Sequence, residues 1–272
     1  MVFDVNRSVQ MPEHTSSKGN QNKWYKDGWW YKEDGLGYES LSEIVVSALL
    51  KKTSIEPFVS YEYAEIVHGD QKLCGCRSRD FMEESDDRVI PVERLFLAYE
   101  GEGASQALLA FRDIKERIRY VVDVVERVTG ISDFGGYLKK MLTIDAVFFN
   151  EDRHFNNIAV IQKKDGSFRE CPFFDHGAAL FSDIRGDYPL AMSVMDCRAK
   201  IKAKPFSMDF DEQLDLCELL YPEGEICMDF TAKDVKKLLD NWHGVYPSAV
   251  LERVQETLTD QIRKYQYLFC GS

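Results

Sequence analysis

Strand-like and helix-like patterns are separated along this 272-residue chain, and this separation is the feature that most constrains its fold. The clearest strand signal is a pair of short aromatic runs, 23–26 and 29–32, around Asp27-Gly28. That dipeptide favours the two-residue turn of a β-hairpin. Further strands are expected at 58–67 and 72–78. Later in the chain the apolar residues recur mostly at helical spacing, so the pattern predicts an α+β fold with a β-rich first part and a mainly helical second part.

One helix is expected inside the β-rich part, because Leu41, Ile44, Val45, Ala48 and Leu49 form a single apolar stripe at helical period. A charged stretch at 80–90 has the composition of a surface connection. We therefore expect two lobes, residues 1–84 and residues 85–272. The helices expected in the second lobe are 108–125 with Gly130 after its end, 137–149, 235–242 and 250–269.

A β-hairpin is expected to interrupt these helices, with strands 158–161 and 168–174 turning at Asp165-Gly166. The residue before the first strand and the residue after the second lie side by side across such a ladder. We therefore expect Asn157 and Asp175 to be neighbours, with Asp152 on the loop just ahead of them. The alternative is that these three residues only cap turns and strand ends.

Two carboxylates and one carboxamide at one place are oxygen ligands, which suit Mg²⁺ or Mn²⁺. Asn157 and Asp175 are the expected metal ligands. Asp152 is then free to accept a proton from a hydroxyl group. An Asp, an Asn five residues later and a second Asp after a hairpin form the layout of phosphoryl transfer, so all three are candidate catalytic residues.

Phosphoryl transfer also needs a cation for the nucleotide phosphates and an acid that holds this cation. Lys32, at the end of the second aromatic strand, is the expected cation, with Lys26 as its rival. Glu39 and Glu43 are four residues apart and share a helix face. Glu43 is favoured because it lies within the periodic stretch. The alternative is a surface lysine and a solvated helix charge.

A polar loop at 15–20 lies where a phosphate-covering loop is needed, and its candidate residues are Ser16, Ser17, Lys18 and Gly19. A flexible linker is the alternative. Asp133-Phe134-Gly135 spells a metal-binding motif of protein kinases, but it precedes Asp152 in the chain. Asp133 is therefore expected to cap a helix instead.

Composition excludes several classes of protein. The formal net charge of −12 disfavours a general nucleic-acid binder, which needs a basic surface. No apolar run reaches the roughly 18 residues of a membrane span, and the N-terminus lacks the apolar core of a Sec signal. We therefore expect a cytoplasmic protein, with export by another route left open. The seven cysteines are scattered and odd in number, which predicts reduced thiols.

The segment from Asp145 to Asn157 resembles the N-x-D-R-H-x-x-N catalytic segment of the HipA-like serine/threonine kinases, and is closest to a short, cell-translocating type of that family. Supporting similarities lie at 30–32, 37–43, 76–81 and 204–207. The resemblance implies a two-lobed protein-kinase-like fold, ATP with Mg²⁺, and a protein substrate with a Ser or Thr acceptor. It also implies autophosphorylation on a serine of the phosphate loop, for which Ser16 and Ser17 are candidates.

Two other functions stay open at this point. The order Asp152-Arg153-His154 also resembles phosphoinositide-type lipid kinases, so the same site would suit a small-molecule or lipid kinase. A pseudokinase or interaction module would bind nucleotide without turnover. Neither the acceptor nor the oligomeric state follows from the sequence.

Overall fold

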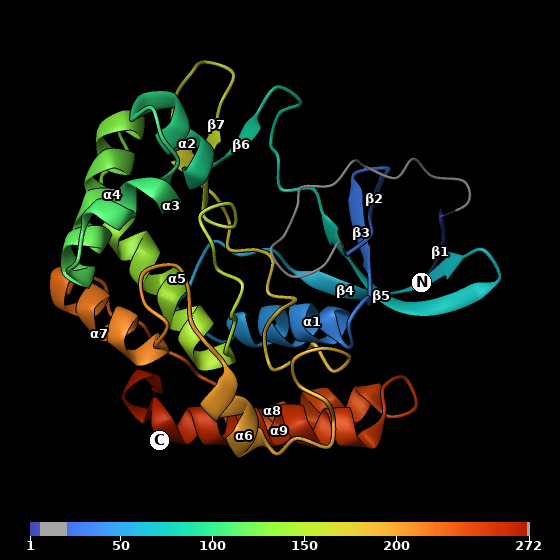
Figure 1. The fold of residues 1–272 in the computed structure, drawn as a ribbon. Coiled ribbons are helices and arrows are strands. Elements are labelled where there is room, and N and C mark those ends of the chain that lie inside the picture. The colour runs from blue at the N-terminus through green and yellow to red at the C-terminus, as the bar shows by residue number, and fades with distance from the viewer. Residues whose placement is uncertain (6–20, 271–272) are drawn as a thin grey trace.

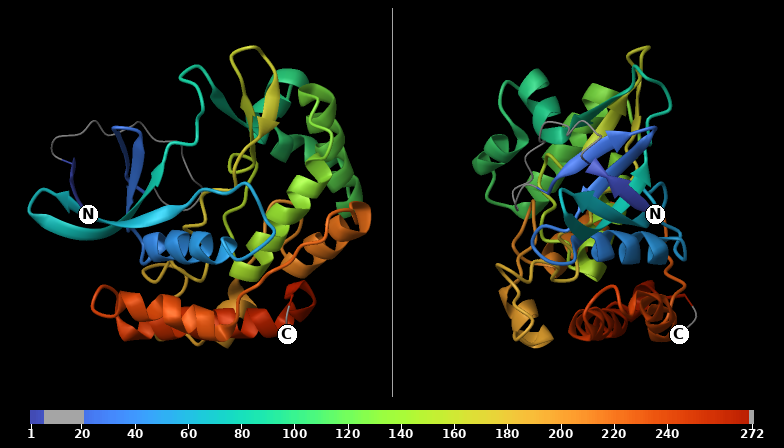
Figure 2. Two further views of the ribbon diagram at one scale, coloured as in Figure 1. Left: turned by 180° about the vertical axis from the view of Figure 1, so that it is seen from behind. Right: turned by 90° about the vertical axis from the view of Figure 1, so that its right-hand side faces the viewer.

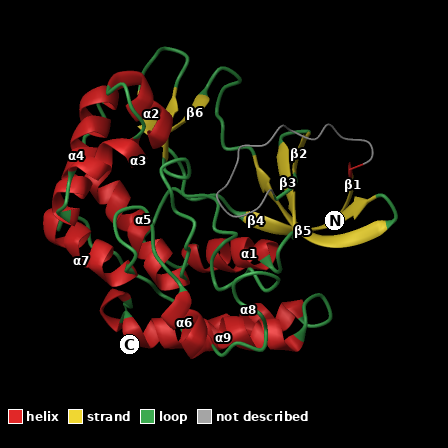
Figure 3. Ribbon diagram, viewed as in Figure 1, coloured by secondary structure: helices red, strands yellow, loops and turns green. Residues whose placement is uncertain are grey.

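Five strands form a curled β-sheet in the first part of the chain, and helices make up most of the rest (Figure 3). The computed structural model describes residues 1–5 and 21–270. The strand order is β1-β4-β5-β3-β2, with β1 parallel to β4 and the other neighbours antiparallel. The strands are β1 (Val2–Asp4), β2 (Lys23–Lys26), β3 (Trp29–Glu33), β4 (Tyr61–His68) and β5 (Gln71–Arg79).

The expected aromatic hairpin is confirmed as β2 and β3. Asp27 and Gly28 both have positive φ, 51° and 77°, as a two-residue hairpin turn with matched twist requires. Alternation along β3 then decides which side chains face which way. Tyr31 stacks on Phe3 with ring centroids 3.7 Å apart, and Lys32 points to the opposite face of the sheet.

A single helix, α1 (Glu39–Leu50), packs on that opposite face against β3, β4 and β5. Figures 1 and 2 show α1 between the sheet and the helices at the C-terminal end of the chain. Ile44 contacts the sheet-side cluster, whereas Leu41, Val45 and Leu49 belong to the large core of the helical part. The sequence predicted one apolar stripe, but α1 is buried on nearly all sides because it is shared by both parts of the molecule.

The hairpin among the helices is also confirmed, as β7 (Ala159–Gln162) and β8 (Phe168–Glu170). Its second strand is shorter than the expected 168–174. A third strand that the sequence did not predict, β6 (Arg88–Pro91), pairs with β7 and begins inside the charged stretch 80–90. After the last strand of the first sheet, the chain therefore runs to the edge of the second hairpin and pairs with it.

Helices expected at four places are present, with shifted ends. The expected helix 108–125 begins only at Ile114, because the Asp113 side chain accepts hydrogen bonds from Lys115 N and Glu116 N and so starts it there. Asp133 caps the next helix as expected, through Gly136 N at 3.1 Å. The sequence did not predict α2, α3, α6 and α7. The helices are α2 (Val92–Tyr99), α3 (Ala104–Ala107), α4 (Ile114–Thr129), α5 (Phe134–Phe148), α6 (Val194–Lys200), α7 (Phe210–Leu220), α8 (Ala232–Leu239) and α9 (Ser248–Lys264), with 3₁₀ turns at Leu108–Ala110, Asp240–Trp242 and Gln266–Leu268.

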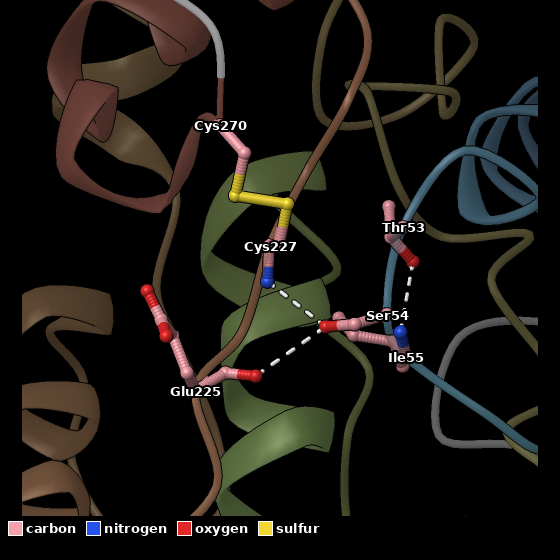
Figure 4. Close-up of a disulfide and its surroundings, with 6 residues drawn as sticks. All are labelled: Thr53, Ser54, Ile55, Glu225, Cys227 and Cys270. Atoms are coloured by element: carbon pink, nitrogen blue, oxygen red, sulfur yellow. Dashed lines mark hydrogen bonds between the residues drawn. A yellow bond between two sulfur atoms is a disulfide. The ribbon is translucent and has the colours of Figure 1, made fainter.

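The expectation of reduced thiols is wrong for one pair of cysteines. Cys227 and Cys270 form a disulfide that joins the loop after α7 to the end of the described chain (Figure 4). Their 43-residue separation in sequence hid the pairing, which the fold creates by running the two segments side by side. Ser54 supports the same place by accepting a hydrogen bond from Cys227 N at 2.9 Å. The other five cysteines are free.

No helix within residues 1–5 and 21–270 combines the length and the apolar composition that crossing a bilayer requires.

Candidate active site

Lys32 lies at the centre of a buried charge cluster. Its Nζ is 2.5 Å from Glu43 Oε1 and 2.8 Å from Asp175 Oδ1. The strand alternation that turns Lys32 toward α1 and the helical position of Glu43 bring the first pair together. The rival residues do not take these positions: Lys26 is exposed on β2, and Glu39 binds Leu36 N and Gly37 N ahead of α1.

The second oxygen of Glu43 is also occupied. Glu43 Oε2 accepts a hydrogen bond from His176 N at 2.8 Å, so α1 holds both Lys32 and the segment that carries Asp175. Asp175 itself has a φ of 62°, a left-handed backbone conformation that Asp tolerates better than most residues. This fixed turn places its carboxylate against Lys32.

Burial and charge oppose each other in this cluster. Burial alone lowers the pKa of Lys32, but the carboxylates of Asp175 and Glu43 outweigh it and hold the pKa well above its usual value. Burial alone raises the pKa of Asp175, but Lys23, Lys32 and Arg153 hold it well below its usual range. Lys32 and Asp175 are therefore ionised at neutral pH. Burial raises the pKa of Glu43, with Lys32 opposing that rise.

Asp152 lies on the loop between α5 and β7, and its side chain is nearly buried. Its Oδ1 is 3.1 Å from Lys204 Nζ, and its Oδ2 is 3.8 Å from His154 Nε2. Its backbone oxygen accepts a hydrogen bond from Asn157 Nδ2 at 3.0 Å. That bond fixes the orientation of the Asn157 amide, so Asn157 Oδ1 remains to accept a hydrogen bond or to bind a metal ion.

Arg153 joins the two segments that carry Asn157 and Asp175. It is fully buried and forms a charge pair with Asp145 on α5, with Nε at 2.9 Å from Oδ2. Its Nη1 donates to Asn157 O at 3.0 Å and to Phe174 O at 3.1 Å. One nitrogen thus bridges the start of the hairpin and the residue before Asp175. The sequence pattern did not assign a role to Arg153. Its position between Asp152 and His154 was the only indication that it belongs to the site.

A cavity of about 210 Å³ brings the sequence candidates together. Asp152, Asn157 and Asp175 line it. Lys32 lies behind Asp175, with its Nζ 2.8 Å from Asp175 Oδ1. The cavity is also lined by Lys23, which is 3.8 Å from Asp175 Oδ2 and which the sequence did not suggest. The candidates Ser16, Ser17, Lys18 and Gly19 lie outside the described residues.

The donor set at this cavity fits a magnesium ion. Asp175 offers a carboxylate and Asn157 an amide oxygen, both hard ligands. In residues 1–5 and 21–270 no three His, Cys, Asp or Glu side chains gather to form a complete metal cage. Mg²⁺ does not need one, since it keeps several waters and takes further oxygens from substrate phosphates. Asn157 and Asp175 are thus the residues that would hold it.

Comparison with known proteins gives a fold but no family. No protein-family model matches the chain, and no curated protein matches its sequence. The structure is similar to the crystal structure of CtkA, a proinflammatory kinase of Helicobacter pylori, with a TM-score of 0.62. The match covers 96% of this chain and 95% of that chain at 16% sequence identity. What this chain shares with the Helicobacter pylori kinase is therefore its α+β fold over nearly the whole length.

Proposed function

We propose that the chain is an ATP- and Mg²⁺-dependent phosphotransferase, a protein kinase of the HipA-like type that acts on Ser or Thr hydroxyls. One observation carries the proposal: Lys32 contacts both Glu43 and Asp175, and Asp175 lines one cavity together with Asp152 and Asn157. These are the groups that phosphoryl transfer needs for phosphate binding, metal binding and acceptor activation. The fold shared with a kinase supports the same proposal.

In this proposal residues 1–84 form the nucleotide-binding lobe and residues 85–272 the catalytic lobe. Lys32 would bind nucleotide phosphate, held in place by Glu43. Asn157 and Asp175 would hold Mg²⁺, which neutralises charge on the β- and γ-phosphates. Asp152 would orient the acceptor hydroxyl and take its proton. Arg153 would keep Asn157 and Asp175 in register. Transfer to Ser16 or Ser17 of the chain itself belongs to the same proposal.

The test is Asp152→Asn, measured by intact mass after incubation with ATP, Mg²⁺ and a generic protein substrate. Loss of the accepting carboxylate should lower the rate of transfer about 100- to 10,000-fold. Nucleotide binding, read as a rise in melting temperature, should persist because Asp152 does not hold the phosphates. Asp70→Asn, in the exposed β4–β5 turn, is the matched control and should change neither quantity.

Other outcomes point to other functions. Transfer to a hydroxyl compound or a lipid in a panel, with none to protein, would indicate a small-molecule or lipid kinase on the same site. If nucleotide stabilises the wild-type chain and no acceptor gains phosphate, the chain is a nucleotide-binding module and the proposal fails.

A further inference from the structure

A second cavity, of about 240 Å³, lies beside the loop that carries Asp152. His154 and Lys204 line it, and both also approach the Asp152 carboxylate, at 3.8 Å and 3.1 Å. The first cavity is therefore lined by Asp152, and the second by two residues that approach its carboxylate. A group seated in the second cavity lies within a short chain length of the atom proposed to accept the hydroxyl proton.

Two cationic side chains, Arg117 and Lys204, line the second cavity, and Lys204 is already paired with the Asp152 carboxylate at 3.1 Å. The Arg117 guanidinium donates to the backbone oxygens of Phe111 at 3.0 Å and Phe206 at 3.3 Å, and no carboxylate among the described residues lies within salt-bridge distance of it.

The carboxylate of Glu93 binds Ser105, another residue of this wall, and forms no salt bridge with Arg117. Its Oε2 accepts hydrogen bonds from Ser105 N at 3.0 Å and Ser105 Oγ at 2.9 Å, and so anchors α3. The remaining walls are apolar, with Leu109, Phe155 and Pro205 among them. Leu109 is 71% exposed, so this part of the wall is open to solvent.

We propose, on the basis of the function inferred above, that this second cavity binds an acidic side chain of the protein substrate, an Asp or Glu near the phosphorylated Ser or Thr. The overall charge of −12 repels an acidic peptide from most of the molecule, so a local cation without a carboxylate partner is needed to bind one, and Arg117 supplies it among the described residues. A basic side chain would be repelled by Arg117. Leu109 and Pro205 would contact an apolar neighbour of the acidic residue.

The experiment compares Ser/Thr peptides with one Asp or Glu at successive positions against peptides with Gln there, using the full chain with ATP and Mg²⁺. Wild type should prefer an acidic residue in at least one position, by about tenfold in kcat/KM. Arg117→Gln should reduce this preference to near one. Arg119→Gln, an exposed arginine on the same helix, should leave it intact.

Arg117 also holds two backbone oxygens, so a second variant guards against misfolding. Leu109→Glu adds a carboxylate to the cavity wall at an exposed position and should also remove the preference. Leu219→Glu, at a 64% exposed position on α7, is its matched control. Lys204 is left intact in this test because it also contacts Asp152. No acidic preference in wild type, or a preference unchanged in both variants, overturns the proposal.

Binding separates this proposal from the kinase function itself. A fluorescent acidic peptide should bind wild type with a nucleotide analogue present, and Leu109→Glu should weaken that binding about tenfold. Binding without any phosphate transfer would keep the acidic subsite and refute the kinase proposal. Phosphate transfer to neutral peptides, with no binding of the acidic peptide, would support the kinase proposal and refute the acidic subsite.

Discussion

The two sides of the Asp152 loop are built differently. On the side proposed to bind nucleotide, Lys32 and Glu43 are buried, and Lys32 lies within 3 Å of both the Glu43 and the Asp175 carboxylate. On the other side, Lys204 is 38% exposed in its side chain, and Arg117 binds only backbone oxygens. The first arrangement costs desolvation and is rigid, which suits a ligand of constant shape such as a triphosphate. The second is open and adaptable, which suits varied protein substrates.

The largest effect is expected from Lys32→Met on the buried side. The change removes the cation that contacts both the Glu43 and the Asp175 carboxylate and leaves the buried Glu43 without a cationic partner, so the free energy of unfolding should fall by about 3–5 kcal/mol. Phosphate transfer should fall about 100- to 1000-fold. Chemical denaturation and transfer assays measure the two losses. Lys72→Met removes an exposed pair with Glu65, 2.9 Å apart, and should change neither quantity much. Equal losses in Lys32→Met and Lys72→Met would mean that burial gives the Lys32 pairs no special weight, and would contradict the prediction.

A smaller effect is expected from Lys204→Ala on the open side. Lys204 is partly solvated, so stability should stay close to wild type. Transfer to a neutral peptide should fall about tenfold, because the cation that positions Asp152 is gone. Lys204→Arg should restore most of the rate, which a purely structural role would not require. A stability loss as large as that of Lys32→Met would place Lys204 with the buried cluster instead.

The smallest effect concerns pH. Burial, followed by the nearby Glu39 carboxylate, raises the pKa of Asp34 from 3.8 to about 7. The folded protein therefore holds a proton that the unfolded chain releases between these values, and the stability from this group falls as pH rises from about 4 to 7. Asp34 accepts hydrogen bonds from Ser40 N at 2.6 Å and Tyr246 Oη at 2.9 Å, so it orders the start of α1.

Asp34→Asn should remove this dependence. The melting temperature of the variant relative to wild type should rise by about 2–4 °C between pH 5 and pH 8. Asp70→Asn should show no such trend. If the difference in melting temperature between Asp34→Asn and wild type does not change with pH, Asp34 is already ionised at pH 5.

Local pattern was sufficient for several elements. The Asp27-Gly28 turn, the hairpin at Asp165-Gly166 and the Asp133 cap depend on backbone preferences of the residues at those positions, and all three are present. The candidate site could also be predicted from the sequence, because a hairpin brings its two ends together whatever the rest of the fold does. Lys32 was favoured over Lys26 for another reason, since it ends the second aromatic strand and precedes the apolar stripe of α1.

Other features depended on long-range contacts that leave no local pattern. The Cys227–Cys270 disulfide joins segments 43 residues apart. The contact between Lys204 and Asp152 spans 52 residues, and a lysine with a solvated face gives the same sequence signal. Arg153 and Asp145 are near in sequence, yet only burial shows that their pair holds the two ends of the hairpin.

The sequence by itself determined the two hairpins with their turns, the helix that follows the first hairpin, and the set of polar residues around the second hairpin, because these follow from short-range backbone and side-chain preferences. Tertiary structure decided which of Lys26 and Lys32 and which of Glu39 and Glu43 enter the charge cluster. It also decided that Arg117 lies beside the Asp152 loop. Those outcomes depend on how the sheet, α1 and the helical part pack together, and the side chains at their contacts are chosen by burial and distance, which no spacing along the chain records.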